Sequence, residues 1–270
     1  MHTPNDSVIR LICIGDIVGQ AGRRVLAHQL PDLRSTYSPH FIVANVENSS
    51  NGSGITWNVY EELVNMGIDI MTGGNHIFAK QEFAKKIDQF TRVIRPLNFP
   101  KNNPGVGYRL YQKDHIKLGV INIIGRVFMT QADCPFHAVN DAIRDLSQHT
   151  NSIIVDFHAE TTSEKKAMAF YLDGKVSCVF GTHTHVQTAD EWILPGHTAA
   201  ITDLGMTGSM NSVLGVQKEI VIERFLTQMP RRFETSKEFP WMVNGIYLEI
   251  DAITGHATKI ERILRTIDHD

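Results

Sequence analysis

Apolar runs rich in β-branched residues recur along this chain, and each passes directly into a short polar segment. The runs are VIRLICIGD (8–16), HFIVANVEN (40–48), IDIMTGGNH (68–76), SIIVDFHAE (152–160), VSCVFGTHTH (176–185) and AAITDLGMTG (199–208). Their apolarity is continuous rather than alternating, which indicates strands that are covered on both faces. Segments with helical spacing lie between several of them, at 22–37, 56–67, 81–90, 137–150 and 216–229. This alternation predicts a layered α/β domain.

Two other stretches are typical of antiparallel hairpins. Residues 106–125 predict a hairpin that turns at KDH (113–115), and residues 242–264 predict one that turns near ITG (253–255). The architecture we expect is therefore a mixed sheet or a two-sheet sandwich flanked by helices. Because no repeat, low-complexity tract or linker interrupts the chain, we expect one domain over residues 1–270.

The composition limits the class of protein and its compartment. With 270 residues, 42% of them hydrophobic, the chain can bury a substantial core. A formal net charge of -3 gives no global basic field, so we expect no extended nucleic-acid surface, although a small anionic substrate is allowed. The three cysteines are far apart in sequence and form no CxxC pair, which favours a reduced cytoplasmic protein. No stretch approaches the ~20 apolar residues of a membrane span, so we expect no membrane partner.

Polar side chains with metal-binding chemistry fall at the carboxyl ends of the predicted strands. These ends form the ligand-binding edge of an open α/β sheet, so side chains placed there can converge in space. Their oxygen and imidazole donors, without a thiolate, are those of a metal site, and one ion needs only about four to six of them. A set this large predicts two ions. The residues are Asp16, Glu47, Asn48, Asn75, His76, His158, His183 and His185.

Most of these residues, taken singly, also have an ordinary structural interpretation. Asp16 could cap a helix, and Glu47, Asn48 and Asn75 could lie in turns. His158 could be a hydrogen-bonded core histidine. The pair in HTH (183–185) is harder to explain without a cation, because adjacent imidazoles repel once they are protonated. The occurrence of all these residues in one chain favours the metal hypothesis, because otherwise every one of the structural interpretations would have to hold at once.

The ordered motifs resemble a known family. Gly15-Asp16, Glu47-Asn48, GGNH (73–76), Phe157-His158 and GTHTH (181–185) are similar to the calcineurin-like metallophosphoesterase pattern. More narrowly, IGDIVGQAGR, VENSSNGSGIT, GGNHIF, RPLNFP, DFHAETTSEK, GTHTHVQTAD and ITDLGMTG resemble the bacterial YmdB-like subfamily, from about residue 8 to about residue 265. The resemblance implies a single-domain metallophosphoesterase-like layered fold of mixed β-sheets flanked by helices. It also implies a 2′,3′-cyclic-nucleotide 2′-phosphodiesterase.

The sequence departs from the broad pattern at three places. Val18 occupies the place of a histidine, Glu47 replaces the usual second aspartate, and Phe78 stands where relatives often have tryptophan. The first two changes are similar to those of the narrower subfamily. Replacing nitrogen by oxygen ligands favours harder ions, so we expect two divalent or trivalent ions per chain, iron or manganese, with zinc as an alternative.

The resemblance also implies a role for each motif residue. One metal would be held by Asp16, Asn48 and His185, and the other by Asn75, His158 and His183. Glu47 would bridge the two ions, and His76 would be the general acid. A hydroxide bridging the metals would attack the cyclic phosphate in line, the 2′ oxygen would leave, and a 3′-phosphate would remain.

Other readings stay open at this point. The same enzyme class could act on phosphomonoesters or phosphoproteins, and a regulatory scaffold with slow hydrolysis belongs to a different class. Trp57 could stack on a base or pack a helix, Arg126 could contact phosphate or form a salt bridge, and Thr207 could contact the sugar or stabilise a turn. The sequence leaves the physiological substrate, native metal, base-recognition residues, any regulatory partner and a possible homo-oligomer undefined.

Overall fold

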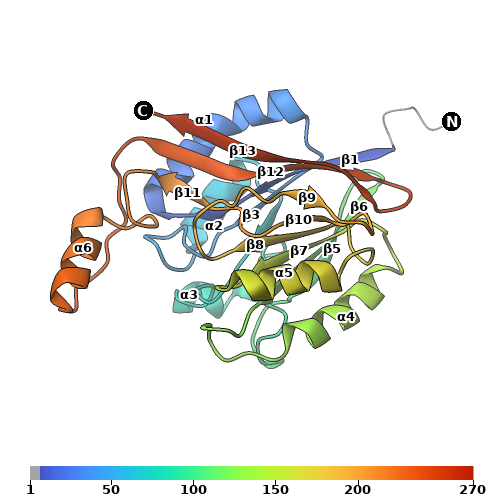
Figure 1. The fold of residues 1–270 in the computed structure, drawn as a ribbon, viewed down its shortest axis with the longest axis horizontal. Helices are drawn as coiled ribbons and strands as arrows, with labels where there is room; N and C mark the ends of the chain where they lie inside the picture. The colour runs from blue at the N-terminus through green and yellow to red at the C-terminus, as the bar shows by residue number, and fades with distance from the viewer. Residues whose placement is uncertain (1–6, 270) are drawn as a thin grey trace.

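The computed structural model describes residues 7–269 and places two β-sheets face to face between layers of helix (Figure 1). The expected α/β fold with mixed sheets in a sandwich flanked by helices is thereby confirmed. We predict a single domain over residues 1–270. Residues 1–6 and 270 lie outside the part of the chain that the structure describes.

The first sheet is mixed and has the order β2-β11-β12-β1-β3-β4, with β13 paired to β12. Strand β1 pairs in parallel with β3, which pairs in parallel with β4, whereas β1 and β12 are antiparallel. The second predicted hairpin forms β12 and β13. The strands are β1 (Val8–Ile14), β2 (Asp16–Ile17), β3 (Phe41–Asn45), β4 (Ile70–Thr72), β11 (Met206–Ser209), β12 (Trp241–Asp251) and β13 (Ala257–Ile267).

The second sheet has the order β5-β6-β7-β8-β10-β9. Its central strands β6, β7, β8 and β10 are parallel, and the antiparallel strands β5 and β9 lie at its edges. The first predicted hairpin forms β5 and β6. The strands are β5 (Tyr108–Lys113), β6 (Ile116–Ile124), β7 (Ile153–His158), β8 (Cys178–Thr182), β9 (Trp192–Ile193) and β10 (Ala199–Ile201).

Helices cover the outer face of each sheet, so that three apolar cores separate the layers. The helices are α1 (Gly19–Tyr37), α2 (Trp57–Asn65), α3 (Gln81–Ala84), α4 (Pro135–Leu146), α5 (Thr162–Tyr171) and α6 (Lys218–Thr227), with a 3-10 turn at Ile87–Gln89. Leu26 of α1 packs in one core with Ile12 of β1. Cys13 and Phe180 share the core between the sheets, and Met168 of α5 packs beneath the second sheet. Strands β3, β7 and β8 are therefore buried on both faces, as their continuous apolar sequences predict.

Two helical segments differ from the sequence expectation. The segment 81–90 forms only the short helix α3 and the following 3-10 turn, although Phe83, Ile87 and Phe90 are all buried, as a helical spacing predicts. The apolar spacing is thus met by two short turns instead of one helix. Helix α5 was not expected, because a lysine, Lys165, occupies its buried face beside Met168 and weakens the apolar pattern.

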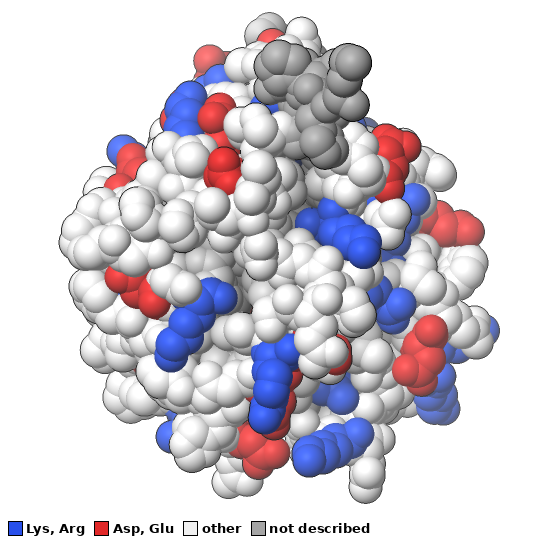
Figure 2. Space-filling model, turned by 90° about the vertical axis from the view of Figure 1, so that its right-hand side faces the viewer, with Lys and Arg blue, Asp and Glu red and all other residues white. Residues whose placement is uncertain are grey.

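The loops that follow β1, β3, β4, β7 and β8 gather at one end of the sandwich, on the left in Figure 1. The opposite end carries basic and acidic side chains interspersed with one another (Figure 2). Among residues 7–269, no helix combines the length and apolarity needed to cross a membrane. Helix α6 projects beside the loop end, and of its residues only Val221 is buried.

Truncating a buried leucine of α1 tests the packing of the first core. We expect Leu26→Ala to lower the free energy of unfolding by about 2–5 kcal/mol, because Leu26 has no exposed surface and its removal leaves a cavity. Leu226→Ala is the matched control, since Leu226 lies on α6 and is 80% exposed. Chemical denaturation of both variants measures the difference, and equal losses would contradict this account of the core.

Candidate metal centre

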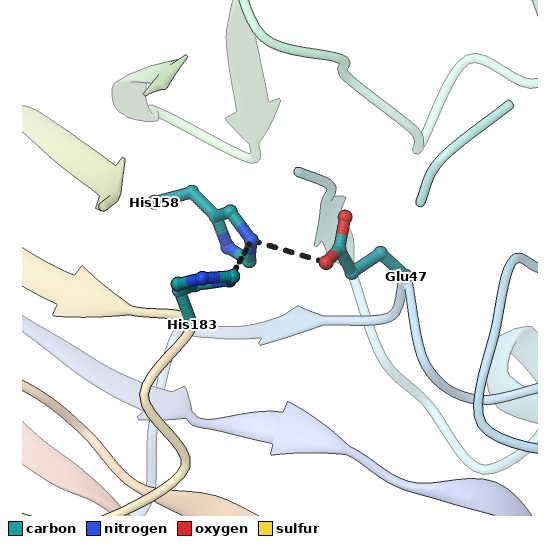
Figure 3. A group of neighbouring side chains, drawn as sticks. All are labelled: Glu47, His158 and His183. Carbon is teal, nitrogen blue, oxygen red and sulfur yellow. Dashed lines mark hydrogen bonds and ion pairs between the residues drawn. The ribbon is translucent and has the colours of Figure 1, made fainter. Parts of the chain in front are cut away.

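Side chains from both sheets meet at the loop end of the sandwich. Glu47 follows β3, His158 ends β7 and His183 follows β8, and their ligand atoms all lie within 4.8 Å of one another (Figure 3). His158 Nε2 lies 3.0 Å from Glu47 Oε1 and 3.1 Å from His183 Nδ1. Asn75, from the loop after β4, places its Oδ1 3.0 Å from the same nitrogen. Four donor groups therefore converge on one point.

The hydrogen-bond network assigns the tautomer of His158. Its Nδ1 lies 3.0 Å from Thr182 Oγ1, and that hydroxyl donates to Asp156 Oδ1 at 2.7 Å. Thr182 can then only accept from the ring, so the proton is on Nδ1 and Nε2 carries a lone pair. Burial lowers the pKa of His158 to about 4, so the ring is neutral at pH 7.

The same reasoning applies to His183. Its Nε2 lies 3.1 Å from Glu160 Oε2, which accepts the ring proton and leaves a lone pair on Nδ1. Burial, assisted by the neighbouring His158, lowers the pKa of His183 to about 3. Lone pairs of the two imidazoles thus face each other beside the carboxyl group of Glu47 and the amide oxygen of Asn75. Such an arrangement is repulsive by itself and fits a bound cation, which all four groups can ligate.

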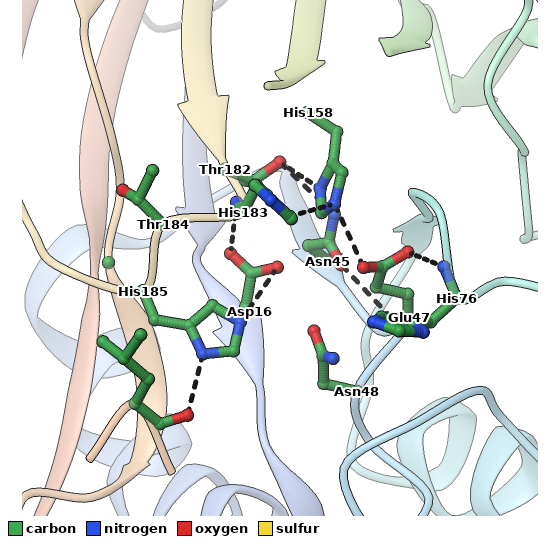
Figure 4. A network of polar contacts seen from close by, with 12 residues as sticks. Asp16, Asn45, Glu47, Asn48, His76, His158, Thr182, His183, Thr184 and His185 are labelled. Atoms are coloured by element: carbon green, nitrogen blue, oxygen red, sulfur yellow. Dashed lines mark hydrogen bonds and ion pairs between the residues drawn. The ribbon is translucent and has the colours of Figure 1, made fainter. Parts of the chain in front are cut away.

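A second group of donors lies next to the first (Figure 4). Among the described residues, Asp16 Oδ1 and Asn48 Oδ1 are buried and have no hydrogen-bond partner. Asn48 Nδ2 donates to the carbonyl of Gly52 at 3.1 Å, which fixes the orientation of the amide. His185 Nδ1 donates to the Leu214 carbonyl at 3.0 Å, leaving Nε2 as the acceptor, 3.8 Å from Asp16 Oδ1. Two orphaned oxygens and an imidazole lone pair fit a second cation.

Electrostatics in this cluster favour added positive charge. Burial raises the pKa of Asp16 to about 7, and the nearby His158 only partly offsets this. Burial likewise raises the pKa of Glu47 to about 7, against the opposing effect of His76. Both carboxylates are therefore poorly compensated by the protein, and a cation would stabilise their charged forms.

The loop that carries HTH is held in a strained conformation. His183 and His185 have φ values of 95° and 65°, which are unusual for residues with a side chain. Between them, Thr184 donates its N–H and its hydroxyl to Asp203 Oδ2, at 3.2 Å and 2.6 Å. The same oxygen accepts from the buried Lys165 at 2.6 Å. The ion pair between α5 and the end of β10 thus fixes the direction of both imidazoles.

Sequence reasoning missed this supporting set of buried polar residues. Asp156 is its centre in the second sheet, where it accepts hydrogen bonds from Thr72, Thr182 and Asn45. An acid inside the apolar run SIIVDFH, and a lysine on the apolar side of a helix, are the signals that could have identified Asp156 and Lys165. Buried charged residues need partners, and here the partners orient the candidate ligands.

His76 lies at the edge of the cluster. Its backbone N–H donates to Glu47 Oε2 at 2.7 Å, and its Nδ1 lies 3.4 Å from Ser53 Oγ. The imidazole is partly exposed and takes no part in the convergence of lone pairs. It is therefore free to interact with a ligand bound at the cluster.

The remaining sequence candidates lie in different environments. Thr207 is fully buried in β11, with its hydroxyl 3.5 Å from the Asn244 carbonyl, so it is structural. Arg126 is exposed beyond the end of β6. Trp57 is half-exposed at the start of α2. Val18, in place of a ligand histidine, packs its side chain against Gly215.

The chain is similar to known proteins over nearly its whole length. The family model described as YmdB-like protein matches residues 12–263. A Bacillus subtilis (strain 168) protein described as 2′,3′-cyclic-nucleotide 2′-phosphodiesterase is 44% identical over 261 residues, covering 97% of this chain and 98% of that protein. The crystal structure of a novel phosphatase from Mycoplasma pneumoniae matches with a TM-score of 0.90 at 34% identity, covering 97% of this chain and 94% of the other. The structure of the Haemophilus influenzae NAD nucleotidase matches with a TM-score of 0.59 at 13% identity. The match covers 97% of this chain and 56% of the nucleotidase, and it shows a similar fold alone.

A methyl group at Gly74 tests whether the first cluster holds a metal. A Cβ at this position would lie 2.3 Å from His158 Nε2 and 2.5 Å from Glu47 Oε2, so Gly74→Ala must displace both donors. We expect metal affinity to fall by about tenfold or more, with the fold retained. Metal analysis of the purified protein by mass spectrometry measures the loss. Gly208→Ala is the control, because its new Cβ would lie at an ordinary contact distance of 3.5 Å from Val18 and should leave the metal content unchanged. An undiminished metal content in Gly74→Ala would contradict the assignment.

Proposed function

This chain belongs to the YmdB-like family, as its motifs predict, and we propose that it is a metal-dependent phosphodiesterase that hydrolyses 2′,3′-cyclic nucleotides to 3′-nucleotides. The observation that carries the proposal is the convergence of metal-ligating groups from Glu47, Asn75, His158 and His183. The Bacillus subtilis relative described as 2′,3′-cyclic-nucleotide 2′-phosphodiesterase supports the choice of substrate, since the similarity spans nearly the whole of both chains.

The two groups of donors suggest how the ions would be divided. In this proposal Asn75, His158 and His183 hold one metal, and Asp16, Asn48 and His185 hold the other. Glu47 would bridge the two ions, and its Oε1 lies 3.0 Å from His158 Nε2 in the first group. When bound, two such ions would neutralise the phosphoryl oxygens and lower the pKa of a water. Oxygen and imidazole donors without thiolate favour iron or manganese, with zinc as the alternative.

The chain's own residues supply the remaining requirements. The leaving 2′ oxygen needs a proton, and we assign that role to His76, since an imidazole can donate a proton near neutral pH. The hydrogen bond from its backbone to Glu47 fixes this residue beside the cluster, and Ser53 Oγ, 3.4 Å from Nδ1, can orient the ring. Asp156 and Asp203 act as positioning residues, because they hold Thr182 and Thr184 on either side of His183.

Replacing the carboxylate of Glu47 by an amide tests the metal-dependent activity. We expect Glu47→Gln to reduce turnover of 2′,3′-cyclic AMP by about 100-fold or more, because the neutral amide removes a charge that both ions would share. Wild-type turnover should vanish with a chelator and return with manganese or iron. Glu219→Gln, on the exposed side of α6, is the matched control.

Three outcomes of this assay would change the proposal. Unchanged turnover in Glu47→Gln, or activity that survives metal removal, would overturn it. Faster hydrolysis of phosphomonoesters than of cyclic diesters would replace it by a phosphatase of the same superfamily.

Removing the imidazole of His76 separates catalysis from metal binding. We expect His76→Ala to keep both metals and to lose about 10²- to 10⁴-fold in turnover of 2′,3′-cyclic AMP. The loss should be smaller for bis(4-nitrophenyl) phosphate, because nitrophenolate leaves without a proton. His149→Ala, at an exposed position, is the control. An equal loss on both substrates would argue against a general acid, and a cellular role that survives this change but not metal removal would favour a scaffold.

A further inference from the structure

A cavity of about 330 Å³ opens between the start of α2 and helix α3. Its walls include three aromatic rings and two lysines, contributed by Trp57, Phe83, Phe90, Lys80 and Lys86. We propose that this cavity binds the nucleobase of the substrate, with the indole of Trp57 as the stacking surface. The inference rests on the proposed function and adds the base-recognition site that the sequence does not define.

The aromatic residues form a supported platform. Phe83 and Phe90 are buried and stacked, with ring centroids 4.4 Å apart and planes at 5°. Trp57 leans on Phe90 at 5.0 Å, yet 48% of the residue remains exposed. Packing of α2 therefore uses only part of the indole. A large apolar ring that is held in place and left uncovered is a suitable surface for stacking a base.

The cavity is lined by residues that lie close in sequence to the candidate metal centre. Its two walls continue from the loops that carry Ser53 and His76, whose side chains lie 3.4 Å apart. Trp57 follows Ser53 by four residues, and Lys80 follows His76 by four. Four residues span at most about 14 Å, which sets an upper limit on the distance of Trp57 from Ser53 and of Lys80 from His76. The proposal places the phosphate at His76 and the base in this cavity.

The two loops also pack closely against each other. A Cβ on Gly54 would lie 2.9 Å from Lys80 Cγ and 3.2 Å from Ala79 Cβ, and Gly54 has a positive φ of 75°. Only glycine suits this contact. The relative position of the cavity and His76 is thus fixed by backbone packing.

The charges at the cavity suit a nucleotide better than an apolar ligand. Three charged residues line the cavity, Lys80, Lys86 and Glu82, so the lining carries more positive than negative charge. Ammonium groups beside aromatic rings complement a base with carbonyl or ring-nitrogen acceptors that is attached to an anionic phosphate. Because every base has a π face, we expect stacking here to distinguish bases only modestly.

A ratio of specificities tests the proposal. The two substrates are 2′,3′-cyclic AMP and glycerol 1,2-cyclic phosphate, which lacks a base. We expect Trp57→Ala to lower the ratio of kcat/KM for the first over the second by roughly tenfold, mainly through KM for cyclic AMP, and Trp57→Phe to restore most of it. Trp192→Ala is the matched control, because Trp192 is 52% exposed on β9 and does not line the cavity.

A binding measurement keeps the test independent of turnover. Titration of the metal-loaded protein with 3′-AMP should quench indole fluorescence, and the quenching should be lost in Trp57→Phe, which retains Trp192 and Trp241. An unchanged ratio in Trp57→Ala, or equal quenching in Trp57→Phe, would overturn the inference. Wild-type protein that turns over neither substrate would instead refute the proposed function, and the titration would then decide the inference alone.

Discussion

The meeting of imidazole lone pairs and buried carboxyl groups at the end of the sandwich is the constraint on which the rest of this structure depends. His158 cannot rotate its lone pair away, because Thr182 fixes its other nitrogen and the ring is fully buried. Burying charged carboxylates without a compensating charge costs several kcal/mol per carboxylate. The protein surrounds them with Asp156, Asp203 and their hydrogen-bond donors, so that the geometry persists in spite of this cost.

Much of the architecture could be predicted because burial leaves a direct mark on sequence. Strands covered on both faces must be continuously apolar, and the polar residue that ends each strand must then face the loop end of the sheet. This reasoning placed Asp16, Glu47 and His158 correctly at one edge. The two hairpins followed from their turn residues and antiparallel spacing. Which ion each residue holds stays part of the proposal.

Other features could not be predicted because they depend on contacts between distant residues. Lys165 reads as a solvent-facing residue of a polar segment until Asp203, 38 positions later, is seen to accept its ammonium. Helix α5 was missed for that reason. The segment 81–90 has the apolar spacing of one helix, but it forms the short helix α3 and a 3-10 turn, with Phe90 stacked on Phe83. Likewise, whether Trp57 packs or stacks depends on how much of its ring Phe90 leaves uncovered.

The origin of the donors in two different sheets has a thermodynamic consequence. Asp16, Glu47, Asn48 and Asn75 come from the first sheet, whereas His158, His183 and His185 come from the second. Any cation that both sheets ligate acts as a clamp across the sandwich, so its binding free energy is linked to their association. The affinity for the ion and the resistance of the two sheets to separation would then be two measures of one equilibrium.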